Sequence, residues 1–187
     1  PSVPQSAREI PVLATVDVVV VGGTVGAVSA ALAARRMGAS VYLVAPRTYL
    51  GEDLCGSLHL WQDEGTPEGE LARKLLTKGN PIPPMHVKRT LSRALLAQAI
   101  PFLFASTASD VLRDGDGRVA GILIANRAGR QAIVAKTVVD ASERGTVARL
   151  AGGESRGGTG GTLTAERVVL VKADEPLITA GGQGVVH

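Results

Sequence analysis

The sequence contains few aromatic residues, a single cysteine and no long apolar run, and each shortage narrows the choice of protein class. Aromatic residues make up 3% of the 187 residues, so a core has to be built from aliphatic side chains. Cys55 stands alone, which excludes an intrachain disulfide and a metal site with several cysteine ligands. The apolar run Val16–Val21 is far too short to span a membrane. Hydrophobic residues at 45% and charged residues at 20% are nevertheless typical of a folded globular chain.

Basic charge is in small excess and is not clustered. The formal net charge is +3, and basic residues are adjacent only in the pairs Arg35-Arg36, Arg73-Lys74 and Lys88-Arg89. A nucleic-acid surface needs clustered basic side chains with stacking aromatic residues, so we expect no nucleic-acid partner. The sequence does not begin with a charged segment followed by a long apolar one, although a removed signal peptide leaves no trace. The compartment therefore stays open, with a slight preference for the cytoplasm.

The first part of the chain has the pattern of a strand, a helix and a second strand. Val16–Val21 is nearly all β-branched, which is typical of a strand buried on both faces. Val25–Met37 is rich in alanine, and Gly38 stands where a helix commonly ends. Val41–Val44 is a second short apolar run. Strand, glycine turn, helix and strand within about thirty residues predict one βαβ unit of a parallel sheet.

The later segments predict helices first and short strands afterwards. We expect a loop over 51–65, helices over 67–78 and 85–99, and a further parallel strand over 101–105. Glycine turns separate the strands of a small antiparallel meander, expected over 108–112, 118–126 and 131–134. The prediction ends with a buried strand over 137–140, a short helix over 145–151 and a last strand over 166–172.

These patterns predict an α/β fold: a Rossmann-like parallel sheet with an inserted small antiparallel β-meander, and the start of a second domain at the C-terminus. Residues 1–15 contain three prolines and are expected to form an N-terminal arm. Residues 16–152 are expected to form the Rossmann-like domain, with the meander at about 108–135. Residues 153–187 are expected to form a linker and the first strand of an incomplete further domain.

The turn after the first strand has the pattern of a dinucleotide-binding site. Such a turn leaves the strand sharply, lets the backbone approach a diphosphate, and directs the N–H groups of the following helix at it. Gly22 supplies the sharp turn, Thr24 stands where a second glycine is usual, and Ala27 takes the third place. The predicted cradle consists of Gly22, Gly23, Thr24, Val25, Gly26 and Ala27. A P-loop is excluded because no Gly-Lys-Ser/Thr follows.

Three segments, in this order, resemble FAD-dependent oxidoreductases of the glutathione-reductase-like class. Asp17–Thr24 and the small residues of the next helix resemble their N-terminus, and Leu50–Gly56 resembles their leucine-glycine-glycine segment. Val138–Gly145 resembles their second flavin motif. The resemblance is closest to the FAD-dependent oxidoreductase family often labelled xanthan lyases, in which a Gly-Gly-Thr turn is common. It implies FAD as the cofactor and a small molecule as the substrate that is oxidised or reduced.

The resemblance also implies where the cofactor would be contacted. The turn 22–27 would hold the diphosphate, and Ala108 would lie near the adenine. The other implied contacts are Ala45, Pro46 and Arg47 at the adenosine ribose, Gly51, Leu54, Cys55 and Gly56 at the ribityl chain and ring, and Ala141 and Ser142 across the cleft. No catalytic acid or base can be named from the sequence, and no metal ligand is expected.

The chain departs from the family pattern in three ways. The family usually has an acidic residue after its second strand, but this chain has Ala45-Pro46-Arg47. An arginine there suits a 2′-phosphate, which keeps an NADP-binding reductase subunit as an alternative. The second motif carries Ser142, Glu143 and Arg144 in place of threonine, glycine and aspartate. The chain also ends at His187, before the substrate domain of the family, so we expect a second chain, in a heteromer or from a processed precursor.

Other readings of the same residues remain open. The glycines of the turn also fit a tight turn that binds nothing, which leaves a non-catalytic nucleotide-binding or structural subunit as an alternative. Cys55 fits a small buried residue, but also a flavin contact, a covalent thioether or a redox thiol. His59 fits a packing or surface position better than flavin attachment or general-base work. Asp140 is expected to orient the second motif rather than to transfer protons.

Overall fold

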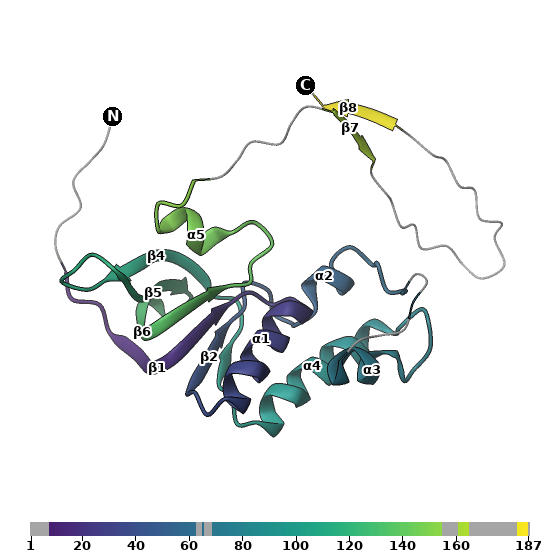
Figure 1. Cartoon of the computed structure of the whole chain (residues 1–187), viewed down its shortest axis with the longest axis horizontal. Helices are drawn as coiled ribbons and strands as arrows, with labels where there is room; N and C mark the ends of the chain where they lie inside the picture. The colour runs from purple at the N-terminus through teal and green to yellow at the C-terminus, as the bar shows by residue number, and fades with distance from the viewer. Residues whose placement is uncertain (1–7, 63–64, 66–68, 155–160, 165–182, 187) are drawn as a thin grey trace.

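The fold was analysed in a computed structural model that describes residues 8–62, 65, 69–154, 161–164 and 183–186 (Figure 1). The elements are β1 (Val12–Val21), α1 (Val25–Arg36), β2 (Val41–Val44), α2 (Glu52–Cys55), α3 (Glu70–Leu76), α4 (Pro84–Ala97), β3 (Phe102–Leu103), β4 (Thr107–Arg113), β5 (Val119–Asn126), β6 (Gly129–Asp140), α5 (Thr146–Leu150), β7 (Gly161–Thr164) and β8 (Gln183–Val186). Their order confirms the α/β fold with a βαβ unit at its start.

Six strands form one sheet in the order β3-β2-β1-β6-β5-β4. The strands β3, β2, β1 and β6 run parallel, whereas β6 with β5 and β5 with β4 run antiparallel. The predicted meander is therefore an extension of the parallel sheet. Strands β7 and β8 pair antiparallel in a second, two-stranded sheet. The strand predicted over 166–172 lies outside the described residues.

Strand β6 differs from the prediction of two separate strands. Residues 129–140 form one continuous strand, in which 129–134 pair with β5 and residues from 132 to 140 pair with β1. The reason is that 135–136 contain no glycine or proline that would turn the chain between the two predicted strands. Strand β1 likewise begins at Val12, because Val12 and residues 14–16 pair with β6. Residues 12–15, predicted as part of the arm, therefore belong to the sheet.

The helices also differ in detail from the sequence patterns. The segment 51–65, predicted as a loop, contains the short helix α2. Helix α4 begins at Pro84 and ends at Ala97, close to the predicted 85–99. Helix α3 occupies 70–76 of the predicted 67–78, and residues 66–68 lie outside the described part. Helix α5 lies within the predicted 145–151.

Both faces of the parallel sheet are covered, which explains why β1 is apolar on both sides. Val20 packs into a buried cluster with side chains of α1 and α4, whereas Val19 and Val21 pack into a second cluster with the meander and with Val147 of α5. Figure 1 shows α1 and α4 on one side of the sheet and α5 on the other. Alternate side chains of a strand point to opposite faces, so the run of valines serves two cores.

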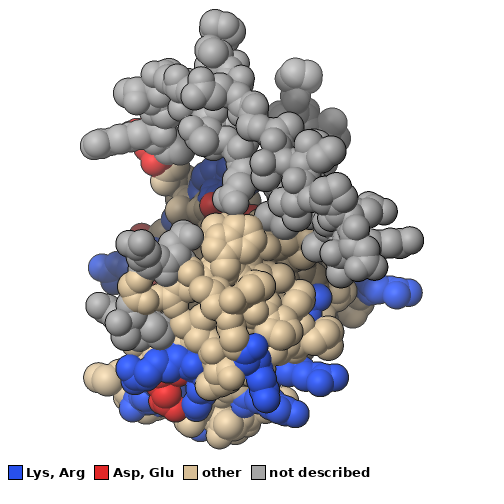
Figure 2. Space-filling model, turned by 90° about the vertical axis from the view of Figure 1, so that its right-hand side faces the viewer, with Lys and Arg blue, Asp and Glu red and all other residues tan. Residues whose placement is uncertain are grey.

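The surface over the helices is unevenly charged. Figure 2 shows one face of the molecule, turned by 90° from Figure 1, with a broad area of uncharged residues and a band of Lys and Arg at its lower edge. Between α1, α3 and α4 lies a cavity of about 540 Å³, lined by apolar residues such as Leu32 and Leu71 and by Arg36 and Lys74.

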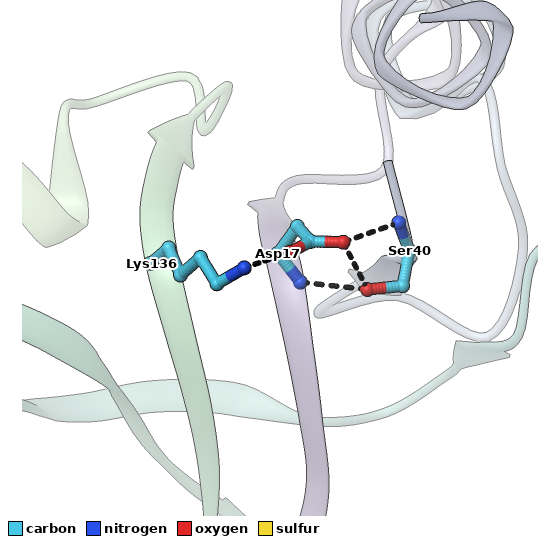
Figure 3. Close-up of polar contacts among 3 residues, drawn as sticks. All are labelled: Asp17, Ser40 and Lys136. Atoms are coloured by element: carbon cyan, nitrogen blue, oxygen red, sulfur yellow. Dashed lines mark hydrogen bonds and ion pairs between the residues drawn. The ribbon is translucent and has the colours of Figure 1, made fainter. Parts of the chain in front are cut away.

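A polar network ties β1 to its neighbours at the edge of the sheet opposite to the β1–α1 turn (Figure 3). Asp17 accepts hydrogen bonds from the Lys136 ammonium at 2.6 Å and from the Ser40 hydroxyl and amide at 2.6 and 2.8 Å. The bonds from Lys136 and Ser40 hold the pKa of Asp17 well below its usual range. The carboxylate therefore joins the middle of β1 to the residue that precedes β2 and to β6.

We expect Asp17→Asn to lower the melting temperature at neutral pH. A carboxyl whose pKa is lower in the folded than in the unfolded chain adds stability above its unfolded pKa of about 3.9, and this stability is lost as the pH falls toward the folded pKa. The melting temperatures of the wild type and the variant should therefore differ at pH 7, and the difference should shrink progressively as the pH falls below about 4. Asp116→Asn, at an exposed ion pair in a hairpin turn, is the matched control. A gap that stayed constant with pH would contradict the prediction.

Candidate functional site

The ends of β1, β2 and β6 meet at one edge of the sheet, and the chain turns away from each at the same place. The Gly22 amide donates to the Val44 carbonyl at 2.8 Å, and the Ala141 amide donates to the Val21 carbonyl at 2.8 Å. Ligands of open α/β sheets bind outside the carboxyl ends of the parallel strands. This edge is therefore the position for a ligand-binding site in this fold.

Gly22 is required at the first position of the turn. Its φ is +143°, and an added Cβ would overlap the carbonyl oxygen of Ala141. The residue is thus fixed by backbone conformation and by the close approach of the segment after β6. This geometry supplies the sharp turn that the sequence predicted, and it brings Ala141 against the turn.

Thr24, which replaces the usual second glycine, is the N-cap of α1. Its backbone is extended, and its hydroxyl oxygen accepts from the Ala27 amide at 3.0 Å. The hydroxyl also lies 3.4 Å from the Ala141 carbonyl, to which it donates. A threonine at this position therefore satisfies one of the free amides of the helix and links the turn to the second motif.

We expect Thr24→Ala to lower the free energy of unfolding by about 1 kcal/mol, the usual cost of removing a Ser or Thr cap. Thr24→Ser keeps the hydroxyl and should retain most of the stability. Urea denaturation of both variants checks the prediction. Equal losses for alanine and serine would show that the methyl group, rather than the cap, matters.

The segment after β2 begins with a glycine that the packing requires. Gly51 has a φ of +81°, and an added Cβ would lie 2.6 Å from Val87 Cγ1 and 3.0 Å from Leu91 Cδ1 of α4. The Gly51 amide donates to the Gly23 carbonyl at 2.6 Å. Helix α2 is thereby held between α4 and the β1–α1 turn, so the segment 51–56 lies against this turn.

Two carboxylates of α2 contact amides of the cradle. Glu52 Oε1 accepts from the Gly23 amide at 3.0 Å. The two carboxylate oxygens of Asp53 lie 3.2 and 3.1 Å from the Val25 amide, which donates to them. Burial raises the pKa of Glu52, against the opposing effect of the Gly23 bond, and burial likewise raises the pKa of Asp53 against the bond from Val25. The side chain of Glu52 is 7% exposed.

A cavity of about 280 Å³ opens beside Glu52 at the strand ends. Its walls come from the segments after β2 and β6, and they carry two arginines, Arg47 and Arg144. The lining residues are Pro46, Arg47, Glu52, Ser142, Glu143, Arg144 and Thr146. Arg47 Nε lies 3.9 Å from Glu52 Oε2, and its side chain is 68% exposed. Guanidinium groups suit a phosphate-bearing ligand.

Asp140 holds the second motif in place. Its carboxylate accepts from the Ser142 hydroxyl at 2.6 Å, from the Ser142 amide at 3.1 Å and from the Ala148 amide at 2.9 Å. Burial opposes ionisation of Asp140, but the bonds from Ser142 and Ala148 outweigh it, and the pKa of Asp140 is lowered. This bonding pattern agrees with a positioning role for Asp140, as the sequence suggested.

Three other residues named from the sequence make packing or local contacts. The Cys55 thiol is 3.7 Å from the Pro84 carbonyl, and burial raises its pKa, which is the reverse of an activated thiolate. His59 stacks on Trp61 with 4.3 Å between ring centroids. Ala108 is 5% exposed and lies in the core cluster with Val44, so its predicted place near an adenine stays a prediction.

The structure brings most of the predicted contact residues together. The turn 22–27, the segments 45–47 and 51–56, and residues 141–142 all meet at the ends of β1, β2 and β6. Sequence reasoning missed Glu52 and Asp53 as partners of the helix amides. The sequence shows two acidic residues after a glycine. It does not show which amides they bind, because the partner amides lie 29 and 28 residues away along the chain.

A diphosphate fits the backbone of this site. The sharp turn and the N-terminus of α1 provide amide donors of the kind that such a group needs, and the adjoining cavity carries two arginines, Arg47 and Arg144, beside the carboxylates of Glu52 and Glu143. The amides of Gly23 and Val25 are held by the carboxylates of α2, so a bound diphosphate would have to replace these partners.

The fold and this edge define the class: a Rossmann-like dinucleotide-binding domain of the flavoprotein type. The family model described as FAD dependent oxidoreductase matches residues 17–179. The chain belongs to this family, whose cofactor is FAD. A search of the curated proteins finds no match.

Solved structures confirm the fold. THI4 of Thermovibrio ammonificans superposes with a TM-score of 0.53 at 19% identity over 73% of this chain and 61% of its own. A geranylgeranyl bacteriochlorophyll reductase-like protein of Thermoplasma acidophilum gives 0.52 at 21% identity over 74% and 42%. The myxobacterial halogenase CndH, described as a variant of FAD-dependent halogenases, gives 0.50 at 19% identity over 80% and 40%.

The chain spans 61% or less of the length of each of these three structures. Within the described residues, no helix is long and apolar enough to cross a membrane. The same residues contain no group of three or more His, Cys, Asp or Glu side chains arranged to hold a metal ion.

Proposed function

We propose that the chain is the FAD-binding part of a flavin-dependent oxidoreductase that acts on a small molecule. The observation that carries this proposal is the β1–α1 turn, in which Gly22 is pressed against Ala141 at the meeting point of three parallel strand ends. Only a glycine, which has no Cβ, lets the second motif approach the turn so closely at this position. Membership in the FAD dependent oxidoreductase family supports the assignment of the cofactor.

Each part of the site has a proposed role toward FAD. The turn Gly22–Ala27 binds the diphosphate, and Ala45–Arg47 borders the adenosine ribose. The segment Gly51–Gly56 faces the ribityl chain and ring, and Ala141-Ser142 closes the cleft opposite the turn. The bound flavin supplies the hydride or electron transfer, while the protein positions it.

We further propose that additional polypeptide supplies the substrate-binding part, as a second chain or a processed precursor would. The support is that this chain spans 42–61% of the length of three solved structures that it resembles. The division into a cofactor domain that ends at 152 and a further part at 153–187 belongs to the same proposal.

An NADP-binding reductase subunit is the second candidate. One observation favours it: Arg47 lines the cavity after β2, where a 2′-phosphate would lie, and no acidic residue ends that strand. One contact argues against this candidate. Arg47 Nε lies 3.9 Å from Glu52 Oε2, so the arginine already has a counter-charge.

The test is binding of the cofactor by the purified full chain. The chain is freed of ligands, mixed with FAD, FMN or NADP and passed through a desalting column. Retained flavin is then measured by visible absorbance, and retained NADP by ultraviolet absorbance. Retention of stoichiometric FAD, with little FMN or NADP, supports the proposal. Retention of NADP alone would favour the reductase subunit, and retention of none would contradict both. Acid precipitation of the FAD complex then shows whether the flavin is covalently attached.

A further inference from the structure

The N-terminus of α1 is occupied by carboxylates from the chain itself. Gly23 donates its amide to Glu52, and Val25 donates its amide to Asp53, at 3.0 Å and at 3.1–3.2 Å. These amides stand at the positive end of a helix of 12 residues. An anion is favoured there because the first amides of a helix lack partners within the helix and the dipole is positive.

The two carboxylates are held in place by the surrounding fold. Gly51 and Glu52 donate their amides to the Gly23 carbonyl, and the Ser57 hydroxyl donates to the Asp53 carbonyl at 2.8 Å. Helix α2 cannot retreat easily, because Gly51 already lies against Val87 and Leu91 of α4. The carboxylates are therefore a built part of the turn.

A diphosphate and these carboxylates require the same donors. The amides of Gly23 and Val25 are the donors that a dinucleotide turn offers to its phosphates, and each amide has one hydrogen to give. A negative diphosphate next to two negative side chains also meets electrostatic repulsion. The positive side chains that line the adjoining cavity, Arg47 and Arg144, lie where a displaced carboxylate or a phosphate can be neutralised.

We propose that Glu52 and Asp53 set the cofactor affinity of this site by occupying the diphosphate-binding amides, so that FAD binds only by displacing them. This inference rests on the proposed function. It predicts that removing the charge of Asp53 strengthens the binding of FAD. Loss of a residue inside a binding site usually weakens binding, so this expected gain is specific to the inference.

The experiment measures binding of FAD, ADP and riboflavin to the full chain by titration calorimetry. Asp53→Asn and Glu52→Gln remove one charge each, and Asp116→Asn removes one charge from a distant hairpin as the matched control. We expect Asp53→Asn to tighten FAD and ADP binding by about tenfold, the equivalent of about 1.4 kcal/mol. Riboflavin, which has no phosphate, should bind the wild type and the variant equally. Glu52→Gln should act in the same direction, and Asp116→Asn should change nothing.

A second measurement uses the wild type alone, so it tests the inference even if the variants do not fold. In the ¹⁵N-labelled wild type, the Val25 amide resonance should move on addition of ADP, because its acceptor changes from a carboxylate to a phosphate. Riboflavin should leave this resonance in place.

The outcomes separate this inference from the proposed function. The inference is overturned if Asp53→Asn binds FAD equally well or more weakly than the wild type, or if the Val25 resonance does not move on addition of ADP. Either result leaves the proposed FAD-binding function standing. Tighter ADP binding by the variant without any FAD binding supports the inference and contradicts the proposed function. A chain that binds neither FAD nor ADP in any variant overturns both.

Discussion

Replacing Gly22 by alanine should abolish FAD binding and destabilise the domain more than any other single substitution at the site. The added Cβ would overlap the carbonyl oxygen of Ala141, and a φ of +143° is a conformation that alanine rarely adopts. Backbone strain of this kind costs about 1–3 kcal/mol, and a forced overlap in a packed region costs a similar amount. To relieve the overlap, the segment after β6 must move away from the turn, which opens the cradle.

Gly38→Ala is the matched control for this prediction. Gly38 also has a positive φ, +88°, but a Cβ there has no neighbour within 4 Å. It should cost only the strain of a left-handed alanine, about 1–2 kcal/mol, and leave cofactor binding unchanged. Urea denaturation gives the stability of both variants, and FAD titration gives the affinity. Equal stability and equal affinity for Gly22→Ala and Gly38→Ala would show that the approach of Ala141 to the turn is unimportant.

Leu91→Ala should destabilise the domain by about 2–5 kcal/mol, the range found for truncating a fully buried leucine. Leu91 is completely buried in the cluster between α4 and the sheet, and its side chain also supports Gly51. For a chain of this size such a loss lowers the melting temperature by roughly 10 °C. Because Leu91 lies beneath the segment that carries α2, its loss should also weaken cofactor binding.

Leu96→Ala is the matched control. It makes the same change of residue type on the same helix, but at an exposed position, so it shows how much of the loss comes from burial. Leu96 is 64% exposed, so the same substitution removes little buried surface and should change the melting temperature by no more than a degree or two. Calorimetric melting of both variants checks the pair. If the two leucines gave similar losses, the buried cluster between α4 and the sheet would not be the main core of this half.

The elements that could be predicted are those with a strong local pattern. The valines of β1, the alanine-rich α1 and the apolar β2 identified the βαβ unit, because a buried parallel strand and a helix differ in composition and period. The boundaries of β6 could not be predicted. Whether 129–134 and 137–140 form one strand depends on β5 and β1, whose pairings overlap at 132–134 and together extend from 129 to 140.

The candidate site was predictable as a list of segments and not as a set of contacts. The glycine turn and the two later motifs marked the three places where the chain leaves the parallel strands, and these places do meet in space. The functions of Thr24 and Asp53 were not predictable. A threonine at a glycine position became a helix cap, and an acidic residue of a presumed loop became the partner of an amide 28 residues earlier.

The sequence by itself determined the class of fold and the resemblance to the family, because these depend on residues that act locally: β-branched runs, a glycine that must turn, and a helix that starts after it. Only the tertiary structure decided what the amides at the start of α1 bind. Hydrogen bonds and electrostatic contacts depend on distance in space, and the packing of Gly51 against α4 brings Glu52 and Asp53 to those amides.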